Sequence, residues 1–80
     1  MVIIKKKEIT ENKISYYYDP NGKGKIGIIN YYPKENKYET EILSEMEDEN
    51  FAFFRRHVWT ALKEFYLTGN YPEEKTIKWY

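Results

Sequence analysis

The apolar residues of this 80-residue chain change their spacing once, and this change limits what the chain can fold into. Up to about residue 43 they alternate with polar residues, which is the pattern of β-strands. From about residue 47 they recur every three or four positions, which is the pattern of a helix with one apolar side. Together the two patterns predict a sheet followed by a helix that covers one of its faces.

Turn residues divide the first half of the chain into four strands. Residues 19–24 contain one proline and two glycines and form the strongest predicted turn. Because short turns join consecutive strands, we expect an antiparallel meander. Gly27 lies within the third strand, where the missing side chain leaves room for a ring from a neighbouring strand. The predicted strands span residues 2–9, 14–18, 25–32 and 37–43.

A single long helix is predicted over about residues 47–68. Ser44 and Glu47 have the spacing of a capping box at its start, and Gly69 stands where a helix usually ends. Residues 76–80 then predict a short final strand. We therefore expect one α+β domain over residues 1–80: a four-stranded antiparallel β-meander followed by one long amphipathic helix packed on the sheet, with a short C-terminal strand. The apolar side of the helix carries Phe51, Phe54, Val58, Ala61, Leu62 and Phe65.

The core must be built largely from aromatic side chains. The chain has no cysteine to form a disulfide or a thiolate zinc site, and it supplies nine Tyr, four Phe and two Trp. Lys and Arg equal Asp and Glu in number, which argues against a dedicated nucleic-acid binder and favours self-association. No apolar run approaches a membrane span, so we expect a soluble cytoplasmic protein. The abundance of Lys, Ile, Asn, Tyr and Glu suggests a bacterial or phage origin.

No motif predicts catalysis or metal binding. Residues 19–30 partly match a calcium-binding EF-hand loop, but Lys23 and Asn30 stand where oxygen ligands, including a bidentate carboxylate, are required. His57 is the only histidine, and no nucleophile in a recognised context accompanies it. The acidic residues within 45–49 are explained by the positive end of the helix dipole. We therefore expect no catalytic residue, no metal ligand and no cofactor, and predict that the protein is not an enzyme.

Tyrosines on the predicted sheet are the strongest candidates for contact with a partner. If the helix covers one face, several rings must lie on the other, and Tyr is common at protein–protein interfaces. Phe53 and Leu67 break the apolar pattern of the helix, and we expect the C-terminal segment to cover them. If they are exposed instead, they mark an interface. The alternative is that the tyrosines only pair across strands and shield the backbone. The candidate partner-binding residues are Tyr16, Tyr17, Tyr18, Tyr31, Tyr32, Tyr38, Phe53 and Leu67.

The same rings beside clustered lysines would also suit single-stranded nucleic acid, whose bases stack on aromatic side chains. Arg55 falls within the apolar arc, where it would stack on Trp59, meet an acid from the sheet or contact an anion. The leading prediction is a non-enzymatic interaction module that binds another protein or itself, as a homodimer, through the Tyr-rich face or a sheet edge. The alternative is a single-stranded nucleic-acid-binding protein. The candidate anion or nucleic-acid contacts are Lys5, Lys6, Lys7, Lys23, Lys25, Arg55 and Arg56.

Overall fold

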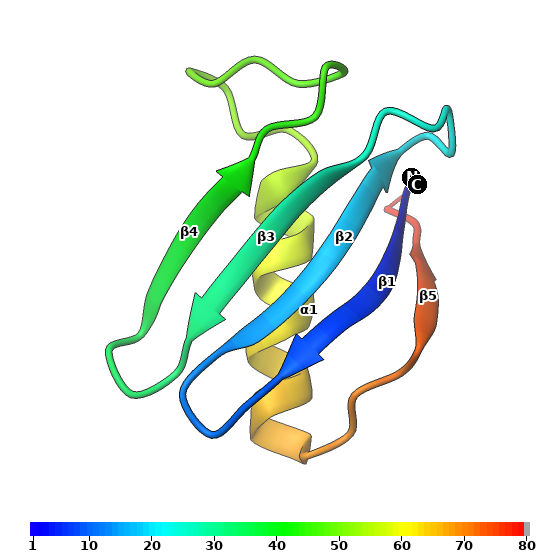
Figure 1. The fold of residues 1–80 in the computed structure, drawn as a ribbon. Coiled ribbons are helices and arrows are strands. Elements are labelled where there is room, and N and C mark those ends of the chain that lie inside the picture. The colour runs from blue at the N-terminus through cyan, green and yellow to red at the C-terminus, as the bar shows by residue number, and fades with distance from the viewer. Residues whose placement is uncertain (80) are drawn as a thin grey trace.

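The protein forms a five-stranded antiparallel sheet with one helix packed across a face (Figure 1). The structure is a computed structural model and describes residues 1–79. The strands lie in the order β4-β3-β2-β1-β5, so the first four form a meander and the last returns beside β1. This arrangement confirms the predicted α+β fold. The elements are β1 (Val2–Ile9), β2 (Ile14–Pro20), β3 (Gly27–Tyr32), β4 (Lys37–Ile42), α1 (Arg55–Thr68) and β5 (Glu74–Ile77).

The strand register decides which side chains face the helix. Tyr16 lies opposite Ile29, and Tyr18 lies opposite Gly27. A β-carbon on Gly27 would lie 2.2 Å from Cε1 of Tyr18, so the tyrosine ring occupies the space that the glycine leaves. This confirms the expected close approach of a neighbouring ring. Because side chains alternate along a strand, Tyr17 between the two buried tyrosines faces the other way.

The core lies between the sheet and the apolar side of α1. Val58, Leu62 and Phe65 of the helix are buried there, and the ring of Phe65 lies 5.5 Å from that of Tyr16. The helix can present these residues together because every third or fourth side chain returns to the same side. The buried core consists of Val2, Ile4, Ile14, Tyr16, Tyr18, Ile29, Tyr31, Phe54, Val58, Ala61, Leu62 and Phe65.

The helix begins at Arg55, so the predicted start at Glu47 is wrong. The preceding residues form a loop, in which Oγ of Ser44 accepts a hydrogen bond from the N–H of Met46 (3.1 Å) and closes a turn. Glu47 nevertheless caps the helix from this loop. Its Oε2 accepts hydrogen bonds from the N–H groups of Phe54 and Arg55 (2.8 and 2.9 Å), which a helix start leaves without helical partners.

The end of α1 and the last strand follow the sequence pattern more closely. Gly69 adopts a left-handed conformation with φ of 72°, and its N–H donates to the carbonyl of Phe65, as expected at a helix end. β5 pairs with β1, with Ile77 opposite Val2 (Figure 1). The predicted last strand spans residues 76–80, whereas β5 begins two residues earlier and ends at Ile77. Tyr80 lies outside the described residues. No helix within residues 1–79 is long and apolar enough to cross a membrane.

Candidate interaction surface

Three of the candidate tyrosines belong to the core. Tyr16, Tyr18 and Tyr31 are at most 2% exposed, because they lie on the face of the sheet that α1 covers. The hydroxyl of Tyr16 donates to the carbonyl of Pro72 (2.6 Å), and that of Tyr18 donates to Oε1 of Glu47 (2.8 Å). Burial raises the pKa of Tyr16 to about 12 and also raises the pKa of Tyr18. Tyr16 and Tyr18 thus join distant segments of the chain, and burial removes all three rings from the surface that a partner can touch.

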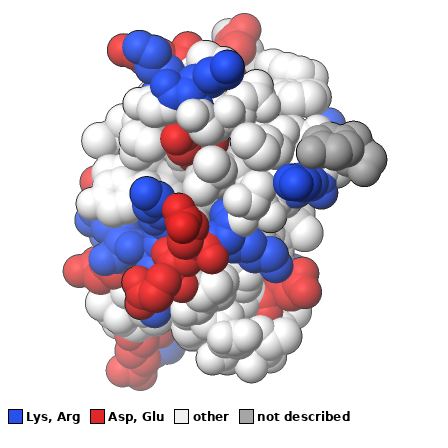
Figure 2. Space-filling model, turned by 90° about the vertical axis from the view of Figure 1, so that its right-hand side faces the viewer, with Lys and Arg blue, Asp and Glu red and all other residues white. Residues whose placement is uncertain are grey.

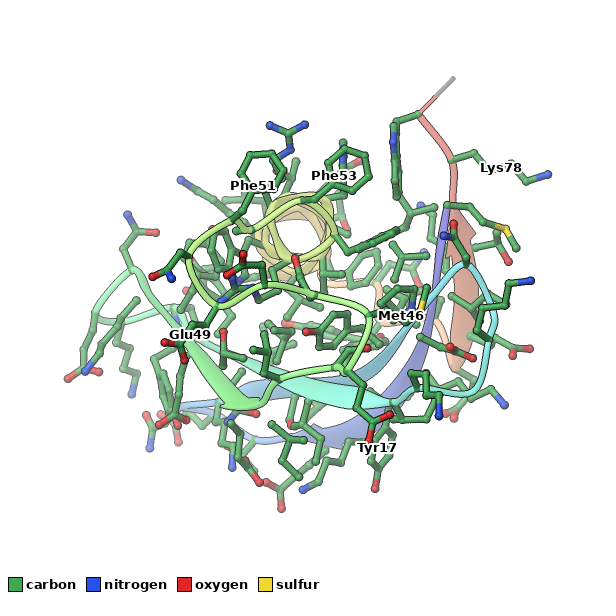
Figure 3. The ribbon with its side chains drawn as sticks, turned by 90° about the horizontal axis from the view of Figure 1, so that it is seen from above. Tyr17, Met46, Glu49, Phe51, Phe53 and Lys78 are labelled. Atoms are coloured by element: carbon green, nitrogen blue, oxygen red, sulfur yellow. The ribbon has the colours of Figure 1, made fainter. Side chains whose placement is uncertain are left out.

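The other three candidate tyrosines do not form one continuous platform. Tyr38 lies on the helix side, half-buried, with its ring 4.7 Å from that of Tyr31. Tyr17 is 37% exposed on the open face of the sheet (Figure 3). It lies opposite Lys5 of β1, whereas Tyr32, partly exposed, lies at the far end of β3. The tyrosines are thus divided between the two sides of the sheet.

Tyr32 belongs to a hydrogen-bonded group with acidic residues on the open face. Its hydroxyl donates to Oε1 of Glu39 (2.8 Å), and Nδ2 of the buried Asn30 donates to both Glu39 and Glu41 (2.8 and 2.9 Å). Hydrogen bonds from Asn30 and Tyr32 lower the pKa of Glu39, and the carboxylate in turn raises the pKa of Tyr32. Two carboxylates beside the ring disfavour the approach of a phosphate backbone.

The basic candidate residues do not form a continuous positive surface. Lys7, Lys23 and Arg56 are exposed and form no ion pair among the described residues. In Figure 2, which views the side of the molecule that carries β5, Lys and Arg side chains are mixed with Asp and Glu. Nucleic-acid affinity depends on an excess of positive charge, which this side lacks. The pairs among the other candidates include Lys5–Glu74 (3.6 Å), Lys6–Glu73 (2.8 Å) and Lys25–Glu45 (3.2 Å).

Both edges of the sheet carry features that discourage pairing with another chain. Along its open face β4 presents the charged residues Lys37, Glu39 and Glu41, and a register shift interrupts its pairing with β3. β5 has only four residues, which include Glu74 and Lys75. Neither edge therefore offers a long apolar strand to a partner.

The loop between β4 and α1, residues 43–54, carries two exposed phenylalanines. Phe51 is 61% exposed and Phe53 is 36% exposed, and their rings stack with centroids 6.1 Å apart. Trp79 meets Phe53 edge to face at 5.8 Å, and His57 stacks on Trp79 at 4.0 Å. Figure 3 shows Phe51 and Phe53 side by side, on the opposite side of the molecule from Tyr17. Phe51, Phe53, His57 and Trp79 are named the aromatic surface, and residues 43–54 the aromatic loop.

Sequence patterns identify only part of the aromatic surface. Phe53 is among the candidates, but the apolar period places Phe51 on the covered side of the helix, and that placement is wrong. Since α1 begins at Arg55, Phe51 lies in a loop, where the helical period does not apply. Trp79 of the C-terminal segment contacts the ring of Phe53, as expected, but leaves that ring partly exposed, and Leu67 is not covered. Leu67, 71% exposed, lies in the last turn of α1, at the other end of the helix.

Glu47 and Arg55 hold the aromatic loop in place. The Glu47 side chain is 1% exposed, and its Oε1 lies 3.4 Å from Nε of Arg55. Nη2 of Arg55 donates to the carbonyls of Asp48 and Glu49 (3.0 and 3.2 Å), and the guanidinium lies 5.8 Å from the ring centre of Trp59. Arg55 therefore meets both Trp59 and an acid, which comes from the loop rather than the sheet, and it is too buried to contact a free anion. A loop fixed from within loses little freedom when a partner binds.

The titratable side chains of residues 1–79 do not gather into a metal site. No three His, Asp or Glu side chains of residues 1–79 lie together in a way that could hold a metal ion. Nε2 of His57 is buried without a hydrogen-bond partner among these residues, and burial, with Arg56 and the N-terminal amino group nearby, lowers its pKa. Shallow depressions of about 230 Å³ and 310 Å³ lie beside Tyr32 and Ile42, and His57 lines neither of them.

The aromatic surface therefore stands out among residues 1–79 as a group of adjoining, partly exposed rings on a loop that buried polar contacts hold in place. Its geometry is the observation from which a function can be argued. Comparisons with protein-family models, with curated proteins and with solved structures found no match for this chain.

Proposed function

We propose that this protein is an interaction module that binds a protein partner through the aromatic surface. The observation that carries the proposal is that Phe51 and Phe53 are exposed on a loop that is anchored by the buried contacts of Glu47 and Arg55. An exposed phenyl ring adds little to folding, whereas its full burial is favourable by roughly 2 kcal/mol. A partner that covers both rings would gain this free energy without ordering the loop first.

The composition of the surface also supports protein recognition. Aromatic side chains, including Phe and Trp, and arginine are enriched at protein–protein interfaces. The guanidinium of Arg56 lies 5.6 Å from the ring centre of Phe53, where it can pair with an acidic group of a partner while still contacting the ring. The exposed Asp48 and Glu49 of the aromatic loop supply the opposite charge beside the rings. Such a polar rim around an apolar centre is the usual anatomy of an interface.

Site-specific photo-crosslinking tests the proposal. Because the chain has no cysteine, Asn50→Cys introduces a single thiol beside Phe51 to which a benzophenone group can be attached. Lys63→Cys, on the exposed side of α1, is the matched control. After irradiation in an extract of the host cell, we expect a discrete protein adduct from position 50 and none of the same mass from position 63.

A second variant separates binding from accidental proximity. Phe53→Ser in the Asn50→Cys chain should abolish the adduct, because it removes one of the two exposed rings. Because Phe53 also contacts Phe54 of the core, circular dichroism should confirm that the variant is folded. Excess unlabelled wild-type chain should compete away an adduct with a different protein, whereas it would itself be captured if the partner is another copy of this chain. If positions 50 and 63 give the same adducts, or neither gives any, the aromatic surface is not a binding site and the proposal fails.

A further inference from the structure

The two ends of the aromatic surface carry opposite charges. In Figure 3, Glu49 lies on the β4 side of Phe51 and Phe53, and Lys78 lies on the far side of them, next to β5. Arg56 adds a second positive group close to Phe53. Among the described residues none of these three charges takes part in an ion pair. Glu49 and Lys78 therefore lie on opposite sides of the two rings, and Arg56 contacts Phe53 directly.

We propose that the partner of the aromatic surface is a second copy of this chain, related to the first by a two-fold axis that passes between Phe51 and Phe53. The proposal rests on the proposed function and names the occupant of that site. Across a two-fold axis, the aromatic surface of one copy faces the same surface of the other copy in reversed orientation. Residue i of each copy then meets residue j of the other. The acidic end at Glu49 then faces the partner's basic end, and the reverse contact forms as well.

Charge favours a second copy over a partner of one sign. A purely basic partner would meet Glu49 well but would place its charges against Arg56 and Lys78, and a purely acidic partner would have the opposite conflict. A copy of the same surface satisfies both ends at once. The chain carries 13 basic and 13 acidic residues, so no net repulsion opposes the approach of two copies.

A stable interface buries about 800 Å² on each partner, out of an accessible surface of 5000 Å² for this chain. The two rings would form its centre, and the start of α1 with Trp79 would extend it toward the basic end. Each copy brings its own pair of rings to the axis, so four phenyl rings would leave water together.

Charge reversal tests the orientation of the two copies. Glu49→Lys places like charges at both contacts of a homodimer, and Lys78→Glu does the same with the opposite sign. Each variant alone should weaken self-association by about tenfold or more, because like charges that face each other across an interface are strongly disfavoured. Mixed together, the two variants place Lys against Glu at both contacts and should form a heterodimer. Lys63→Glu, outside the surface, is the control and should behave as the wild type.

Solution mass by sedimentation equilibrium or light scattering gives the readout. The wild-type chain should approach twice its mass of 9.8 kDa as concentration rises. A wild type that stays monomeric up to about 1 mM, where even weak association would show, overturns the second-copy proposal. A dimer that neither reversal weakens overturns the proposed orientation.

The two proposals fail in different ways. A monomeric wild type whose position 50 still crosslinks to a different protein refutes only the second copy. The absence of both a dimer and a crosslink refutes the proposed function too. Both proposals are supported if a dimer forms in three samples only: the wild type, the mixture of the two single reversals, and the double variant Glu49→Lys/Lys78→Glu.

Discussion

Oε1 of Glu47 lies 3.4 Å from Nε of Arg55, and the two side chains are only 1% and 9% exposed. The same carboxylate accepts hydrogen bonds from the hydroxyl of Tyr18 and from two N–H groups at the start of α1. One buried acid thus joins the sheet, the aromatic loop and the helix. The exposed positions of Phe51 and Phe53 depend on this junction, because both residues lie outside the strands and the helix.

Glu47→Ala should destabilise the protein by about 3–5 kcal/mol, because it leaves the buried guanidinium of Arg55 without its acid. It also removes the acceptor for the first N–H groups of α1. Urea unfolding followed by circular dichroism measures the change. Glu45→Ala, which breaks an exposed pair with Lys25, should change the free energy of unfolding by no more than about 0.5 kcal/mol. Equal effects of the two substitutions would contradict the role assigned to Glu47.

Gly27→Ala should be among the most damaging single-methyl changes in the chain. The new β-carbon would lie 2.2 Å from Cε1 of Tyr18 and 2.6 Å from the carbonyl oxygen of Ile42, so the sheet would have to open at this point. We expect a loss of about 3 kcal/mol or more, at the upper end for an overpacked core. Gly24→Ala provides the comparison, since no atom lies within 4 Å of the added carbon and only the positive φ of 80° is strained. In thermal melts, Gly27→Ala should lower the melting temperature clearly more than Gly24→Ala does.

Stability should fall at alkaline pH as buried tyrosines are forced to ionise. Burial raises the pKa of Tyr16 from 10.0 to about 12, so its contribution is fully present below pH 10 and is lost as the pH rises toward 12. Urea midpoints measured from pH 9 upward should therefore decrease beyond about pH 10. Tyr16→Phe should lower stability at neutral pH, because the hydrogen bond to Pro72 is lost, but should flatten this alkaline decrease. A wild type and a Tyr16→Phe variant with parallel pH curves would show that Tyr16 does not contribute to the effect.

His57 should titrate below its ordinary pKa of 6.5, because burial against Trp79 and the nearby Arg56 and N-terminal amino group disfavour the protonated ring. A depressed pKa means that the contribution of His57 to stability is present above pH 6.5 and is lost as the pH falls. As the only histidine, it can be followed by proton NMR without assignment of the whole spectrum. Trp79→Ala should move the pKa back toward its ordinary value. A wild-type pKa at or above 6.5 would mean that the stack is not maintained in solution.

Single-stranded nucleic acid should not bind at moderate salt. The exposed Phe51 and Phe53 are flanked by Asp48 and Glu49, and much of the lysine charge is paired with acids. Fluorescence anisotropy of a labelled mixed-sequence oligonucleotide should show no binding at about 200 mM salt. Binding that is present at about 50 mM salt and falls steeply by 200 mM would favour the nucleic-acid alternative instead. Tyr17→Ser would then show whether the open face of the sheet contributes.

Alternation along the strands predicted which residues share a face, but it could not predict which face the helix covers. Tyr16 and Tyr18 are identical to Tyr17 as local signals, yet two are buried and one is exposed. The choice depends on where the chain after β4 crosses the sheet. The same limit applies to Arg55. Its position in the apolar arc predicted that the guanidinium has a partner, but not that this partner is Glu47 of the preceding loop.

The sequence by itself determined the order of strands and helix, the turns between the first four strands, the end of α1 at Gly69 and the need for a small residue at position 27. Each of these depends on neighbours within a few positions, through side-chain period, turn conformation or steric room. Only the tertiary structure decided where α1 begins, that β5 pairs with β1, and that Phe51, Phe53 and Trp79 come together as an exposed surface. These features arise from contacts between distant segments. Such contacts include that of the buried Glu47 with Arg55 and Tyr18. The free energy gained from them outweighs the local preference for an earlier helix start.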